Sequence, residues 1–174
     1  MALCVFAPAL HAELVTVDGA TWLRGEILPP DLLALSRRAR EPGLVLHLDS
    51  RGGNLTSAIA IGRLLRAMKA TARVEAGASC LSACVLVLAG APHRGIAPGA
   101  AIGLHRPHDD EDERLPAQVL RDKQARLEAF VKAYLREVNV PTTLFESMQQ
   151  APQGRMLPPS ELAWYGLDGD DRRQ

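Results

Sequence analysis

The sequence predicts a single α/β domain built on a largely parallel sheet. The segment 44–48 is almost wholly apolar, which is typical of a strand covered on both faces, and further strands are expected at 71–76 and 101–104. A helix at 55–70 and a second helix that begins near Ser82 alternate with these strands. Such alternation favours right-handed crossovers and therefore parallel strands. With 174 residues, the chain is long enough to bury a substantial core.

Two extended segments precede the first helix. They cover 13–17 and 22–28, on either side of an Asp18-Gly19 turn signal. Pro29-Pro30-Asp31 then opens a helix over 32–40, which ends at Pro42-Gly43.

The second half of the chain carries a long amphipathic helix at 116–138. Its apolar stripe consists of Leu120, Leu127, Phe130, Val131, Tyr134 and Val138. Such a stripe packs against the body of the domain or against another subunit, and the sequence leaves both open. A strand at 93–97 precedes this helix, and shorter helices at 141–148 and 158–165 follow it.

The ends of the chain set the expected domain boundaries. Residues 13–168 are expected to form the domain, and 169–174 a loose tail. Residues 1–12 resemble the end of a signal-peptide apolar region but lack a basic start, so a signal remnant and a frayed or truncated N-terminus both stay open. The first alternative implies an exported, periplasmic protein, and the second a cytoplasmic one. The charged run 108–114 is predicted to be a solvated loop.

Composition narrows the classes of partner. The formal net charge is zero, which indicates neither a nucleic-acid partner nor an anionic membrane surface. No apolar run approaches the ~20 residues that a transmembrane helix needs. Cys4, Cys80 and Cys84 make no disulfide framework, and no second close Cys/His pair completes a tetrahedral metal site. We therefore expect no tetrahedral metal site, and the mechanism considered below for Ser82 requires no metal or organic cofactor.

Cys80 and Cys84 are spaced one helical turn apart. The spacing favours two small buried thiols, since a disulfide within one helix is strained. In an oxidising compartment, pairing of the two cysteines stays open.

Ser82 is the candidate nucleophile, at the start of a buried helix within Gly77–Gly90. A serine hydroxyl needs a base within hydrogen-bond reach and N–H donors for the oxyanion that forms on attack. A helix N-terminus offers backbone N–H groups, and the Gly52-Gly53 turn lets a second stretch of backbone approach a ligand closely. His105, after a neighbouring strand, is the candidate base. Each signal alone is weak, because serine is also a common helix cap.

Four segments follow one another in the order of a known family. Residues 49–53 (Asp-Ser-Arg-Gly-Gly) resemble an Asn-Ser-Pro-Gly-Gly turn, and 77–90 resemble its serine helix. Residues 104–107 (Leu-His-Arg-Pro) resemble an Ile-His-Gln-Pro segment, and 155–167 resemble a C-terminal signature. The chain thus resembles, over about 22–168, the Clp protease proteolytic subunit and the crotonase-fold serine peptidases, which include signal peptide peptidase A. Cys-Leu-Ser-Ala-Cys is most similar to a small exported Clp-like subgroup.

This resemblance implies a ββα spiral core and a serine peptidase that cleaves peptide bonds through an acyl-enzyme. It implies Ser82 as nucleophile, His105 as general base, and the backbone N–H groups of Gly53 and Ala83 as the oxyanion hole. The spacings between these residues fit the family pattern. A peptide or protein substrate and a homo-oligomer are also implied, while an ATP-driven partner stays open.

The third member of the family's triad does not carry over. Its aspartate should lie where this chain has Gln153-Gly154, and no carboxylate lies between residues 146 and 161. Loss of this aspartate can cost on the order of 10⁴ in rate. Three alternatives stay open: Ser82 and His105 act as a dyad, another group orients His105, or the site no longer catalyses. Asp109 and Asp110 are near in sequence, but their charged run favours a solvated loop.

Two rival functions follow from these departures. One is a catalytically silent scaffold that keeps the fold and its interfaces. The other is an acyl-CoA enzyme of the crotonase type, which uses the same oxyanion hole without a nucleophile. Arg51, in place of the family's proline, would put a cation beside the oxyanion site.

Overall fold

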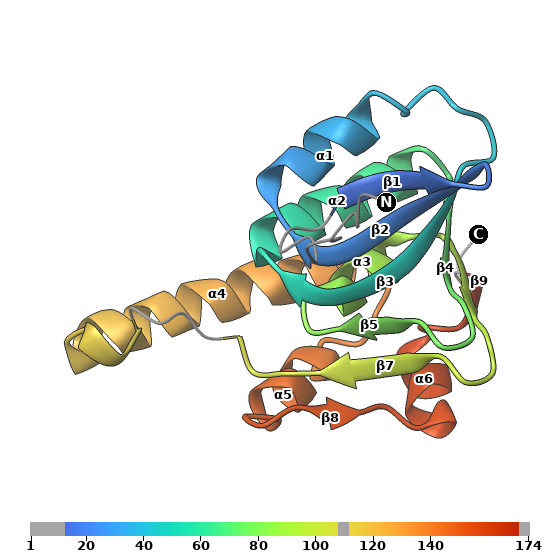
Figure 1. Cartoon of the computed structure of the whole chain (residues 1–174). Coiled ribbons are helices and arrows are strands. Elements are labelled where there is room, and N and C mark those ends of the chain that lie inside the picture. The colour runs from blue at the N-terminus through green and yellow to red at the C-terminus, as the bar shows by residue number, and fades with distance from the viewer. Residues whose placement is uncertain (1–12, 108–111, 171–174) are drawn as a thin grey trace, which may run out of the picture.

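One mixed sheet organises the fold, and helices pack against it (Figure 1). The structure is a computed structural model that describes residues 13–107 and 112–170. In chain order its strands are β1 (Glu13–Val17), β2 (Ala20–Ile27), β3 (Val45–Gly53), β4 (Thr71–Val74), β5 (Ser79–Leu81), β6 (His93–Ile96), β7 (Ala101–Leu104), β8 (Arg155–Met156) and β9 (Gly169–Asp170).

The pairings of β2 to β7 are parallel, whereas β1, β8 and β9 join antiparallel at the edges. The main path runs β8-β7-β5-β3-β4-β6-β9, and β3 also pairs with β2, which in turn pairs with β1. This topology confirms the predicted α/β class with a mostly parallel sheet. Strand β3 is central, because β4 pairs near its start (Val45 with Thr71) and β5 near its end (Ser50 with Cys80).

The helices are α1 (Pro29–Ser36), α2 (Leu55–Ala67), α3 (Cys84–Gly90), the 3-10 turn η1 (Asp112–Arg114), α4 (Ala117–Glu137), α5 (Thr143–Gln149) and α6 (Pro159–Tyr165). Helices α2 and α3 approach very closely at two glycines. A Cβ atom on Gly90 would lie 2.3 Å from the Cα of Gly62, so neither helix tolerates a side chain there. All seven residues of α3 are buried, which makes this helix the centre of the core.

Helix α4 is divided between a packed end and an exposed end. Val131, Tyr134 and Leu135 near its C-terminus are fully buried. The hydroxyl of Tyr134 donates to the carbonyl of Leu86 at 2.8 Å, and burial raises the pKa of this phenol. Phe130 is 37% exposed, and Figure 1 shows the N-terminal part of the helix reaching away from the sheet. The predicted apolar stripe is therefore only partly covered within this chain.

Several boundaries differ from those expected. Helix α1 ends at Ser36 rather than at residue 40. Strand β3 continues through the glycine pair to Gly53, because β2 keeps pairing with it up to Ile27. Gly169 and Asp170, expected in a tail, pair with β6.

The outer face of β3 is only half covered, so the expectation of a strand buried on both faces is wrong. Leu46 and Leu48 are fully buried on the helix side, while His47 on the other side is half-buried. Here His47 stacks on Trp22 with ring centroids 4.8 Å apart, and its Nδ1 lies 3.0 Å from a carboxylate oxygen of Glu75. On this face His47 thus has a stacking partner in Trp22 and a polar partner in Glu75.

Candidate active site

Ser82 lies in a tight turn between a strand and a helix. Strand β5 ends at Leu81 and α3 begins at Cys84. The φ of Ser82 is 54°, a left-handed conformation that is uncommon and strained for a residue with a side chain. Its backbone N–H donates to the carbonyl of Gly103 at 2.8 Å, which joins the turn to β7.

Ser79 lies on a strand and is not part of the helix that follows Ser82. Ser79 to Leu81 form β5, because residues 79–81 pair in parallel with Ala101 to Gly103 of β7. The backbone N–H of Ser79 donates to the carboxylate of Asp49 at 3.1 Å. The helix therefore starts two residues after Ser82, and the serine is presented by a turn.

Cys80 and Cys84 form a disulfide around this turn. Both cysteines are fully buried, and their Cα atoms are 5.2 Å apart. The expected pair of free thiols is thus replaced by a bond, because Cys80 lies on a strand and Cys84 begins a helix. The objection to a bridge within one helix does not apply to this geometry.

The glycine pair at the end of β3 packs directly against the serine turn. Gly52 has φ 97° and Gly53 has φ 134°, both in the region that favours glycine. A Cβ atom on Gly52 would lie 2.8 Å from the carbonyl oxygen of Leu81 and from the Cβ of Ser82. A Cβ atom on Gly53 would lie 2.5 Å from the carbonyl oxygen of Ile27. Only glycine fits at either position.

Ser50 supports this glycine turn, although the sequence had not singled it out. Its hydroxyl donates to the carbonyl of Gly25 at 2.6 Å and accepts the N–H of Gly52 at 3.1 Å. Ser50 is only 1% exposed. The one sequence feature that could have indicated this role is the position of Ser50, two residues before the glycine pair. The hydrogen bond to Gly25 could not be predicted, because Gly25 lies on another strand.

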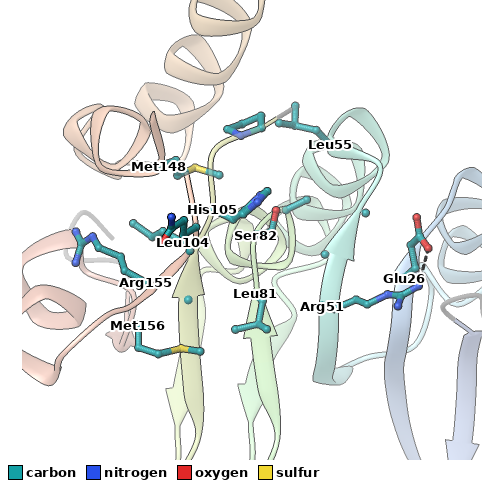
Figure 2. Close-up of a pocket in the computed structure, with 17 residues that line it drawn as sticks. Glu26, Arg51, Leu55, Leu81, Ser82, Leu104, His105, Met148, Arg155 and Met156 are labelled. Atoms are coloured by element: carbon teal, nitrogen blue, oxygen red, sulfur yellow. Dashed lines mark hydrogen bonds and ion pairs between the residues drawn. The ribbon is translucent and has the colours of Figure 1, made fainter. Parts of the chain in front are cut away.

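His105 follows β7 and faces the same pocket as Ser82 (Figure 2). The pocket has a volume of about 930 Å³ and is also lined by Gly53 and Ala83. Figure 2 shows the hydroxyl of Ser82 and the imidazole of His105 directed into this pocket. All four residues expected to take part in the chemistry are therefore brought to one cavity.

The rest of the pocket wall is mostly apolar, with two ion pairs. The apolar lining comprises Leu55, Leu81, Leu104, Met148 and Met156. Arg51 contacts the carboxylate of Glu26 at 3.0 Å, so the expected cation beside the site is partly neutralised. Arg155 binds both carboxylate oxygens of Glu161, at 3.0 and 2.7 Å, and this hydrogen bonding lowers the pKa of Glu161.

Gln153 and Gly154 line the pocket at the place where the family's aspartate is expected. Gly154 has φ 81°, and a Cβ atom built on it would lie 3.6 Å from the carbonyl oxygen of Leu104. Among the described residues, Glu26 is the only carboxylate that lines the pocket. Asp109 and Asp110 lie outside the described residues.

No helix in the described ranges is long and apolar enough to cross a bilayer. Residues 13–107 and 112–170 also contain no cluster of three His, Cys, Asp or Glu side chains that could hold a metal ion.

Solved proteases share this fold. A mutant of the membrane-bound stomatin-specific protease 1510-N is 20% identical, with a TM-score of 0.62 over 84% of this chain and 75% of that one. A second mutant of that protease, in complex with a substrate peptide, is 20% identical, with a TM-score of 0.63 over 84% of this chain and 71% of that one. A mutant of ClpP1 from Listeria monocytogenes is 15% identical, with a TM-score of 0.63 over 87% of this chain and 91% of that one.

At these identities the likeness establishes the fold alone. No curated protein matches the sequence significantly. The family model of Clp protease matches residues 23–138, which include the glycine pair, the serine turn and His105. The chain belongs to the Clp protease family.

Proposed function

We propose that this protein is a serine peptidase that hydrolyses peptide bonds through an acyl-enzyme on Ser82. The observation that carries the proposal is the single pocket lined by Ser82, His105, Gly53 and Ala83. Membership in the Clp protease family supports the same reaction class. The mostly apolar wall suits an extended peptide with apolar side chains.

In the proposed reaction the hydroxyl oxygen of Ser82 attacks the carbonyl carbon of the scissile bond. His105 accepts the hydroxyl proton and then donates it to the leaving amine, which breaks the C–N bond. Water, deprotonated by His105, hydrolyses the resulting ester and restores the serine. This sequence needs no metal or organic cofactor.

The oxyanion of each tetrahedral intermediate would accept hydrogen bonds from the N–H groups of Gly53 and Ala83. The N–H of Gly52 donates to Ser50, so Gly53 is the member of the glycine pair left to face the oxyanion. Ala83 is the N-cap of α3, where the helix dipole favours negative charge. Ser82 has a left-handed φ, and the packing around its turn holds the backbone in this conformation. In the proposal, this conformation sets the direction of the Ser82 hydroxyl and of the neighbouring N–H groups.

In this proposal Ser82 and His105 act without the family's aspartate, whose place is taken by Gly154. A site without that carboxylate retains the nucleophile, the base and the oxyanion hole but loses much of the rate of the family's triad. We therefore expect slow turnover and a reactive serine.

One observation favours a second candidate, a catalytically silent scaffold. The same Gly154 position lacks the aspartate, while α4 exposes Val119 and Phe130 as a surface for self-association. In that case oligomer formation, and not Ser82, would carry the biological activity.

Active-site labelling tests the proposal. A fluorophosphonate probe reacts with an activated serine hydroxyl, so intact mass should show one adduct per chain. Ser82→Ala should abolish the adduct, and His105→Ala should slow its formation at least about 100-fold.

Ser79→Ala is the matched control, because Ser79 lies in the same segment but on β5. It should still be labelled. Folded protein that acquires no adduct at all would overturn the peptidase proposal and leave the scaffold.

A further inference from the structure

The Cys80–Cys84 disulfide encloses the reactive part of the proposed site. Only three residues lie between the two cysteines: Leu81, Ser82 and Ala83. Two of these are the proposed nucleophile and one of the two proposed oxyanion donors. The covalent ring therefore contains two of the four groups that the proposed reaction uses, and Gly53 and His105 lie outside it.

The bridge joins a short strand to a fully buried helix. Strand β5 has only three residues and lies between two neighbours: it pairs with β3 at Ser50 and Cys80, and with β7 along its whole length. Helix α3 begins at Cys84 and is buried along its whole length. The bond between Cys80 and Cys84 thus ties the middle of β5 to the first residue of α3, across the turn that carries Ser82.

The turn inside the ring carries strain that something must oppose. Left-handed backbone costs roughly 1–2 kcal/mol for a residue with a Cβ, and Ser82 adopts it with φ 54°. The turn also packs against Gly52 with no spare room, since a Cβ atom there would lie 2.9 Å from the nitrogen of Ala83. Any relaxation of the turn would move Ser82 and Ala83 relative to the glycine pair.

We propose that the Cys80–Cys84 disulfide positions Ser82 and Ala83 for acyl transfer, so that reducing it lowers turnover. The inference rests on the proposed function and adds a redox requirement to it. Two unbonded sulfur atoms need more separation than bonded ones, and both lie in the fully packed core. The turn must therefore shift when the bond is broken.

The redox step is an ordinary thiol–disulfide exchange. A dithiol reductant gives two electrons and two protons to the bridge, its own sulfurs join as a disulfide, and Cys80 and Cys84 become thiols. A disulfide oxidant such as oxidised glutathione reverses the change. Both forms keep the same Ser82 and His105.

The expected effect is on kcat rather than on KM. A displacement of about 1 Å in a reacting group can cost on the order of 100-fold in rate. Leu81 is inside the ring, but the other apolar lining residues, such as Leu55 and Met148, lie outside it, so peptide binding should change less than turnover. We expect reduction to lower kcat and the rate of fluorophosphonate labelling by roughly 10- to 100-fold.

The test uses the full chain with Cys4→Ser, so that Cys80 and Cys84 are the only cysteines left in it. Intact mass follows the gain of two hydrogens on incubation with dithiothreitol until reduction is complete. Labelling rate, peptide kcat and KM, and the thermal midpoint are then measured in both forms. Reoxidation should restore the original rates.

Cys80→Ala with Cys84→Ala keeps the chain from forming the bridge and needs no access of reductant to the core. This double variant should behave like the reduced form, and dithiothreitol should not affect it. Amide hydrogen exchange across 79–86 should speed up in both, while exchange in α2 stays unchanged. A rate that falls only together with global unfolding would overturn the inference.

The outcomes separate the two proposals. Equal labelling rates in oxidised and reduced protein overturn the positioning role and leave the peptidase standing. If the oxidised form is not labelled, the peptidase proposal fails. Amide hydrogen exchange across 79–86 is then the measurement that tests whether the disulfide holds the turn. Unchanged exchange across 79–86 would overturn the positioning role in that case.

Discussion

Ser50 of β3 is paired with Cys80 of β5, which places the glycine turn beside the serine turn. The Ser50 hydroxyl reaches from there to the carbonyl of Gly25 and to the N–H of Gly52. One buried side chain therefore links β2, the proposed oxyanion turn and the strand that leads to Ser82.

Ser50→Ala should weaken both stability and turnover. It removes the partner of the part-buried Gly25 carbonyl and of the buried N–H of Gly52, which costs about 1–3 kcal/mol in the free energy of unfolding. Because the glycine turn loses its support, kcat should fall at least about tenfold with little change in KM. Urea unfolding and steady-state kinetics with one peptide measure both effects. Ser36→Ala, which removes an exposed hydroxyl bond to Leu33, is the control and should cost under about 0.5 kcal/mol. A Ser50→Ala enzyme with wild-type kcat would contradict the supporting role.

Gly52→Ala should be more harmful than Gly19→Ala, although both glycines have positive φ. At Gly19, φ is 79° and no atom lies within 4 Å of an added Cβ, so only the backbone strain of roughly 1–2 kcal/mol applies. At Gly52 the added Cβ would meet the serine turn at 2.8 Å, which should cost about 1–3 kcal/mol more. Denaturant unfolding compares the two variants. Labelling of Ser82 should be lost only in Gly52→Ala, and equal labelling in both would speak against the close packing of the two turns.

Gly154→Asp should raise activity, because it places a carboxylate where the family has its aspartate. The position lines the pocket, and an added Cβ would make only ordinary contact at 3.6 Å. Aspartate and asparagine tolerate left-handed backbone better than most residues. A carboxylate able to reach His105 should raise kcat at least about tenfold. Gly154→Asn has the same shape without the charge and should not do so. Equal rates in the two variants would show that the charge plays no part.

The Arg155–Glu161 pair predicts a stability difference that depends on pH. Hydrogen bonding to Arg155 lowers the pKa of Glu161 from its ordinary 4.5. A carboxyl whose pKa is lower in the folded state stabilises the fold above its unfolded pKa, and this contribution disappears as the pH falls through the folded pKa. Glu161→Gln should therefore unfold more easily than wild type at pH 7, and the two should converge at pH values well below 4.5. Urea midpoints at several pH values measure this. A difference that stays constant with pH would rule out the pair as its source.

Self-association, if it uses α4, should depend on Phe130 and Val119. These are 37% and 44% exposed, whereas the C-terminal end of the same helix is buried within the chain. Phe130→Glu with Val119→Glu should lower the sedimentation coefficient while circular dichroism still shows a folded chain, since both side chains are exposed on α4. Leu33→Glu is the control, because Leu33 is 58% exposed on α1. An oligomer lost equally with Leu33→Glu would place the interface elsewhere.

Local patterns predicted the fold and grouped Ser82, His105 and the Gly52-Gly53 turn, while the family resemblance assigned the oxyanion hole to Gly53 and Ala83. Alternating strands and helices gave the mostly parallel sheet, since short crossovers leave few other topologies. Gly53, Ser82 and His105 each end a strand or follow one, and parallel strands bring their carboxyl ends to one edge of the sheet. That is why residues far apart in the chain could be assigned to one cavity.

The sequence did not reveal that Ser79 to Leu81 form a strand. Small residues and cysteines are compatible with a helix, and only pairing with β3 and β7 makes the strand. The left-handed Ser82 follows from that pairing, because the chain must turn sharply between β5 and the buried α3.

What the sequence determined by itself was the identity and order of the reactive groups and of the glycines that let them meet. The tertiary structure decided the conformation of Ser82, the bond between Cys80 and Cys84, and the support from Ser50. Each of these depends on a contact with a strand distant in sequence or on the packing around α3. Local propensity cannot encode such contacts, because they exist only once the sheet has formed.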